Sequence, residues 1–163
     1  MMSNGADIID KAGKKLLKGV PELSQPLEEL LPNIQTVAQG EGTLDELQDV
    51  TRILVPGFFT QQAAKCIPLI AECVKALGKL PPATPPSAKI QRSWIEDINN
   101  KLRTLQSQTF PQMEANVSTF YTVPEPTSKI SALASIVAKL PGLIADFVVM
   151  TVNLVKIKKA LKR

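Results

Sequence analysis

Residues 142–163 read GLIADFVVMTVNLVKIKKALKR, a long apolar segment followed by a basic one. If residues 142–155 form a helix, every side of it is apolar except at three positions, so nearly all sides need burial. These 14 residues are fewer than the roughly 20 that a helix needs to cross a bilayer, and a carboxylate inside the bilayer would cost on the order of 3 kcal/mol. The pattern therefore predicts a helix at the centre of a bundle, with its lysine-rich last turns in solvent. The three polar positions are Asp146, Thr151 and Asn153.

Asp146 and Asn153 are seven residues apart and therefore share one face of this helix. They would either pair with polar groups across the bundle, and so fix its register, or mark the wetter side of the helix. No base or nucleophile accompanies them in an arrangement that indicates catalysis. We interpret both as structural residues.

The rest of the chain also has helical periodicity, because apolar residues recur at intervals of three and four and no segment alternates convincingly at period two. The clearest stripe is Ile95, Ile98, Leu102 and Leu105. The 13 prolines and 8 glycines divide the pattern into about six to eight segments. The predicted fold class is all-α, a multi-helix bundle in which several helices are kinked or terminated by proline.

Specific glycine and proline residues are expected to end or bend these helical segments. We expect Gly19 to follow the first helix, Pro32 to kink or delay the second, and Pro68 to bend a helix over residues 58–80. We expect Pro141-Gly142 to end or bend the helix before the last one. The apolar stripes assigned to the core include Ile8 in the first helix, and Ile67 and Val74 in the helix over 58–80.

The segment PPATPPS, residues 81–87, is rich in proline and favours an extended conformation of about 3.1 Å per residue, enough to bridge roughly 20 Å. The chain length suits one domain with a real core. We therefore predict a single helical domain over 1–163, built either as one unit or as two helical halves, 1–80 and 88–163, joined by this linker.

The positive charge is concentrated at the end of the sequence. The formal net charge is +4, and the last eight residues supply five basic side chains, so residues 1–155 carry −1. A second basic cluster at residues 11–18 is partly offset by nearby aspartates, and the chain has few aromatic rings for base stacking. This distribution argues against nucleic-acid binding. It makes the C-terminal cluster the candidate interaction site, either for a protein partner or for an anionic membrane surface. The cluster consists of Lys156, Lys158, Lys159, Lys162 and Arg163.

The amino-acid composition argues against an enzyme. Histidine is absent, which removes the side chain best suited to proton transfer near neutral pH and the commonest transition-metal ligand. Cys66 and Cys73 are seven residues apart, about 10 Å along a helix, which is too far for a mutual disulfide. We expect both thiols to be reduced and buried, and the protein to be intracellular, without a signal peptide. No phosphate-binding, metal-binding or calcium-binding spacing is present, so no cofactor is predicted.

Two short motifs resemble peptide-recognition patterns. The sequence LEELL, residues 27–31, fits a helix-in-groove motif, but any leucine-rich amphipathic helix produces it, and we assign it to the core. The prolines at 82 and 85, preceded by Lys79, fit a polyproline ligand, and we interpret them as a spacer.

Two functions fit these observations. The first is a non-enzymatic structural, scaffolding or adaptor protein that binds protein partners through helix faces, within a homo-oligomer or a larger assembly. The alternative is a membrane- or lipid-binding helical protein, a lipid carrier or a pore former, that uses the apolar helix of residues 142–155 and the basic tail.

Overall fold

A computed structural model of the chain describes residues 4–39 and 44–161. Within these ranges the structure is helical and has no strand, so the predicted all-α class is confirmed. The helices are α1 (Asn4–Ala38), α2 (Leu44–Ile53), α3 (Phe58–Leu77), α4 (Arg92–Thr104), a π-helical turn (Leu105–Thr109), α5 (Phe110–Thr122) and α6 (Pro126–Leu161).

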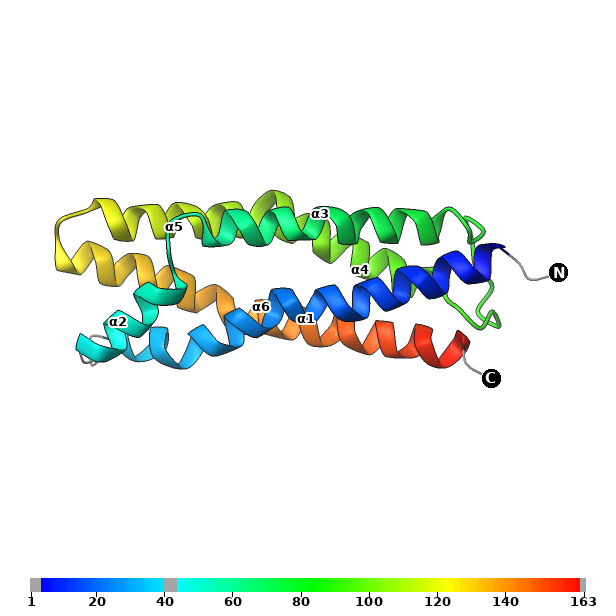
Figure 1. Ribbon diagram of the computed structural model, residues 1–163, viewed down its shortest axis with the longest axis horizontal. Helices are drawn as coiled ribbons and strands as arrows, with labels where there is room; N and C mark the ends of the chain where they lie inside the picture. The colour runs from blue at the N-terminus through cyan, green and yellow to red at the C-terminus, as the bar shows by residue number, and fades with distance from the viewer. Residues whose placement is uncertain (1–3, 40–43, 162–163) are drawn as a thin grey trace.

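The long helices form an antiparallel bundle with four sides (Figure 1). Helix α1 packs against α6 and α3, while α4 and α5 pack against α3 and α6 on the opposite side, so that α3 and α6 lie diagonally across the bundle. Helix α4, the π-helical turn and α5 follow one another without a break. Counted as uninterrupted rods, the described part of the chain has five, slightly fewer than the six to eight segments predicted. The short helix α2 lies at the end where α1 finishes and α6 begins.

Helix α1 continues through the positions expected to interrupt it. Gly19 does not end it, and Pro21, Pro26 and Pro32 all lie inside it. Each proline removes one backbone donor, but none of the three is buried, so the freed carbonyl groups can be hydrated. Gly19 serves a packing role instead, because a Cβ atom there would lie 2.5 Å from a methyl group of Leu69 on α3.

Helix α6 is likewise continuous, since Pro141 lies within its 36 residues and neither ends it nor separates two helices. Pro141 and Gly142 are both exposed, which again leaves the unpaired carbonyl on the solvent side. The chain therefore has one helix over residues 126–161 where the sequence suggested two segments.

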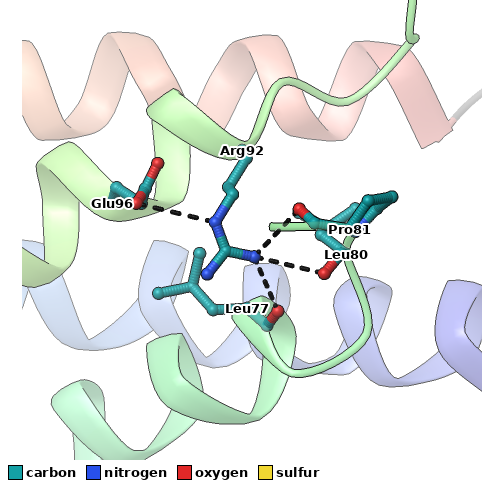
Figure 2. A network of polar contacts seen from close by, with 5 residues as sticks. All are labelled: Leu77, Leu80, Pro81, Arg92 and Glu96. Carbon is teal, nitrogen blue, oxygen red and sulfur yellow. Dashed lines mark hydrogen bonds and ion pairs between the residues drawn. The ribbon is translucent and has the colours of Figure 1, made fainter. Parts of the chain in front are cut away.

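The loop between α3 and α4 reverses the direction of the chain, and α3 packs directly against α4. The Nη1 atom of Arg92 donates to the carbonyl oxygens of Leu77, Leu80 and Pro81 at 3.0, 3.1 and 3.2 Å, which brings the two ends of the loop together (Figure 2). The Nε atom of Arg92 lies 3.5 Å from a carboxylate oxygen of Glu96. One guanidinium group thus joins the end of α3 to the start of α4.

The core is a continuous set of aliphatic and aromatic side chains from the four long rods, with Val50 and Leu54 added from α2 and the residue after it. The predicted stripe on α4 is confirmed, since Ile95, Ile98, Leu102 and Leu105 are all buried. Leu27 and Leu30 are fully buried as well, which places the LEELL motif in the core. Ile8 is only partly buried, and the prediction failed for α3, where Ile67 and Val74 are 56% and 49% exposed.

Candidate interaction surface

Helix α6 buries one side and exposes the other. Leu143, Phe147, Met150 and Leu154 on its inner side are buried. The prediction that this helix is surrounded on nearly all sides was wrong, because it has neighbours only on the α1 side and the α4–α5 side among the described residues. The exposed side, called the outer face of α6 below, repeats every three or four residues. Its first half is Ala134, Ala138, Pro141 and Ala145, and its second half is Val148, Val149, Val152 and Val155.

The outer face carries no charge over its whole length. Lys139 and Asp146 are the charged residues of the sequence between 130 and 155, and both contact the α4–α5 rod. The Nζ atom of Lys139 donates to Gln112 at 3.0 Å, and Asp146 lies 3.7 Å from the Nζ atom of Lys101. The side-chain amide of Asn153 donates to Asp97 at 3.1 Å. Asp146 and Asn153 thus pair across the bundle, as one of the two interpretations from the sequence supposed.

Bulk is distributed unevenly along the outer face. Its first half offers alanine and proline, while the second half offers four valines with exposed fractions between 38% and 56%. Ala134 and Val155 are 21 residues apart, which corresponds to about 32 Å of helix. Between Ala134 and Val155 the face is thus a long neutral strip with small side chains in its first half and bulkier ones in its second, and the exposed Ile130 lies one turn before it.

The basic residues predicted as an interaction site lie at the end of α6 and point in different directions. Lys156 has its Nζ atom 6.0 Å from the centre of the Trp94 ring on α4. Lys158 borders a hollow toward α1, and Lys159 is exposed one turn beyond Val155. Lys162 and Arg163 lie outside the described residues.

The fold brings the two basic clusters of the sequence together. Helices α1 and α6 run antiparallel, so the start of α1, with its lysines at 11, 14, 15 and 18, lies beside the end of α6 (Figure 1). We call the part of the bundle formed by residues 4–19, 69–97 and 153–161 the basic end. Its sequence holds 11 basic and 5 acidic residues, a net of +6.

The opposite part of the bundle has the opposite charge. We call the part formed by residues 31–39, 44–58 and 111–136 the acidic end. Its sequence holds 2 basic and 5 acidic residues, a net of −3. The part between the two ends holds 4 of each and is neutral. The bundle is therefore electrically polar along its long axis, which the net charge of +4 does not reveal.

A hollow of about 400 Å³ separates α1 from α6 within the basic end. Gly13 leaves room there, and Leu17, Leu154 and Ile157 line the hollow. Lys158 and an ion pair between Lys14 and Asp10, at 3.1 Å, stand at its border. It is an apolar crevice with a charged rim.

The buried and half-buried polar groups hold helices in place. Both carboxylate oxygens of Glu114 on α5 accept backbone N–H groups at the start of α3, from Gly57, Phe59 and Thr60, at 2.9 to 3.1 Å. The hydroxyl of Tyr121 donates to the Leu54 carbonyl at 2.7 Å, and burial raises the pKa of Tyr121. The sequence did not indicate either contact, because each joins residues more than 50 positions apart.

The two cysteines are free and buried, as predicted. Burial raises the pKa of each thiol from 9.0 to about 12, so neither is a nucleophile near neutral pH. No group of three potential metal-ligating side chains occurs within 4–39 and 44–161.

One helix of the described chain, α6, is long and apolar enough to cross a membrane when length and composition alone are considered, and 33% of its most apolar stretch is buried in the bundle. Core helices of soluble proteins meet the same criterion. A comparison of this chain with protein-family models, curated proteins and solved structures finds no match.

Proposed function

We propose that this chain is a non-enzymatic structural or adaptor protein that binds a protein partner through the outer face of α6. The observation that carries the proposal is the neutral strip of alanine and valine that α6 exposes over about 32 Å. Contiguous apolar patches of this kind are uncommon on solitary soluble proteins and are typical of binding surfaces.

The chemistry of the strip suits polypeptide better than lipid. Helices that bind at a membrane surface use large side chains such as Trp, Phe and Leu to enter the acyl region, whereas this face consists of Ala, Pro and Val. In addition, Glu28 on α1 borders the same small hollow as Val148 and Val152, and a carboxylate there repels anionic headgroups. Small side chains also let another helix approach closely.

The test uses material purified from the native source and measures its mass by light scattering. The proposal predicts a mass above 17.7 kDa for the natural chain and a return to 17.7 kDa when Val148 and Val152 are both replaced by Asp. The matched control replaces Ile67 and Val74 by Asp, because these are equally exposed valine and isoleucine residues on α3. A natural chain that remains at 17.7 kDa with no copurifying protein would refute the proposal.

Membrane binding is the second candidate, and the length and apolar character of α6 together with the basic end favour it. Flotation with vesicles of neutral and anionic phospholipid tests it. Binding that requires the anionic lipid, and is lost when the five C-terminal basic residues are replaced by Gln, would support this candidate. Absence of flotation with either lipid would exclude it.

A further inference from the structure

We propose that the partner on the outer face of α6 is a second copy of this chain, packed antiparallel about a two-fold axis near Gly142. This inference rests on the proposed function, since it names the partner for the same face. Three properties of the surface lead to it: its distribution of bulk, the electrical polarity of the bundle, and its neutrality.

The first argument is steric. An antiparallel pair that crosses near Gly142 places the alanine half of one face against the valine half of the other. Ala138 then lies opposite Val148 of the second copy, and Ala134 opposite Val152. Large side chains meet small ones at both ends, so the two helices can remain in contact along the whole strip. A parallel pair would set alanine against alanine and valine against valine, which forces the helices apart at one end.

The second argument is electrostatic. In the antiparallel arrangement, the basic end of one copy, net +6, lies beside the acidic end of the other, net −3. At each end of the pair, the exposed Glu125 of one copy lies close to Lys159 of the other when their positions are compared along the helix axis. The parallel arrangement would set the two basic ends side by side. Charge complementarity of this kind selects orientation and accelerates association.

The third argument concerns the neutrality of the strip, together with its size. A strip one helix wide is at the small end of specific interfaces, so the dimer should dissociate on dilution. The two monomers have a neutral strip between them, with Glu28 of α1 at its border, and no charged side chain of α6 between 130 and 155 has to lose its water when they meet. We therefore expect a reversible monomer–dimer equilibrium with a dissociation constant on the order of micromolar.

The first experiment is analytical ultracentrifugation of the purified natural chain from about 1 to about 200 µM, a range that brackets such an equilibrium. We expect the mass to rise from one chain toward two. Replacing Val148 and Val152 by Asp should raise the dissociation constant at least tenfold, while the α3 control at Ile67 and Val74 should leave it unchanged. Circular dichroism of every variant checks that the helices are intact.

The second experiment determines the orientation by cross-linking with a short bifunctional thiol reagent. The native thiols are buried with a raised pKa and do not compete. Ala138→Cys mixed with Val148→Cys should cross-link, whereas either variant alone should not, because identical positions lie about 15 Å apart along the antiparallel pair. Strong cross-linking of Ala138→Cys to itself would instead demonstrate a parallel pair and overturn the proposal.

The third experiment exchanges charges between the two ends. Glu125→Lys alone, and Lys156→Glu with Lys159→Glu, should each raise the dissociation constant, and the triple variant should recover part of the loss. The natural association should also weaken as the salt concentration rises. No recovery in the triple variant would contradict the antiparallel register.

The outcomes separate this inference from the proposed function. A natural chain that stays monomeric up to about 200 µM refutes the dimer. If that same chain forms a complex with a different protein in its native source, and Val148→Asp with Val152→Asp abolishes the complex, the proposed function stands and only the identity of the partner is wrong. A chain that is monomeric in both settings refutes both.

Discussion

Cys66 and Cys73 lie on the inner side of α3, and their burial has a measurable chemical consequence. Desolvation disfavours the thiolate and raises the pKa of both thiols to about 12, and for Cys73 the nearby carboxylate of Glu72 adds to this, while Arg103 opposes it. At pH 8 we expect a thiol reagent to label the native protein far more slowly than the protein in concentrated urea. Labelling of the native protein at the rate of a free cysteine would contradict the burial.

The same two thiols make stability depend on pH. Between pH 9 and about 12 the unfolded chain loses the thiol protons while the folded chain keeps them, so the folded state binds more protons and stability falls as pH rises. Below pH 9 both states keep the thiol protons, so the two buried thiols make their full contribution to stability there. Denaturant titrations should show a steeper loss above pH 9 for the natural chain than for a Cys66→Ala, Cys73→Ala variant. Equal slopes would rule out a contribution from the cysteines.

At the scale of a single element, the start of α3 depends on one side chain from another helix. Glu114 accepts three backbone N–H groups there, the donors that a helix end leaves unpaired, and its charge is favourable at a helix N-terminus. We expect Glu114→Ala to lower the free energy of unfolding by about 1 to 2 kcal/mol, and Glu114→Gln by less, because one oxygen acceptor remains. Urea denaturation measures both. If Glu114→Ala leaves the free energy of unfolding unchanged, water replaces the carboxylate without loss of stability.

The end of α3 has its own clamp in Arg92, whose guanidinium group bridges three carbonyl oxygens of the loop (Figure 2). Lysine keeps the charge but lacks the planar fork, so Arg92→Lys should not preserve the contacts. We expect faster limited proteolysis within residues 78–91 for this variant and little change in the helices. Identical cleavage rates for Arg92→Lys and the natural chain would contradict the clamp.

The buried stripe of α4 could be predicted from the sequence, whereas the continuity of α1 and α6 could not. The stripe on α4 was predictable because Ile95, Ile98 and Leu102 repeat at the helical period and all meet the core. The continuity of α1 and α6 was not predictable, because a proline ends a helix only when packing does not offset the lost hydrogen bond. The local sequence around Pro32 or Pro141 does not contain that packing.

The outer face of α6 was not predictable from the sequence, and the interaction site predicted at the basic residues stays a prediction. Lys156, Lys158 and Lys159 follow from composition, whereas the exposure of Val148 and Val152 depends on how many neighbours α6 has. Hydrophobic periodicity describes which sides of a helix are apolar and not which of them another helix covers. The contact of Glu114 with α3 was missed for a related reason, since no local pattern links residues 55 positions apart.

At the scale of the whole molecule, the two parts of the sequence on either side of the loop interleave. Helix α1 from the first part packs along α6 from the second, and α3 packs against α4 and α5. We therefore expect neither residues 1–80 nor residues 88–163 alone to unfold cooperatively, and we expect the two fragments together to regain helicity when mixed. Circular dichroism with heating tests this. A cooperative transition in either fragment alone would show that the halves are independent domains.

The start of α1 and the end of α6 lie at the same end of the bundle (Figure 1), and residues 10 and 161 border the same hollow. A short glycine-serine tether that joins the start of α1 to the end of α6 would therefore cross little space, and the exposed stretch at 85–87 offers a place for new termini. A circular permutant of this kind would retain every helix while the chain order becomes α4, α5, α6, α1, α2 and α3. In that order α6 and α1 become sequence neighbours, so their pairing would no longer require the chain to close its longest loop.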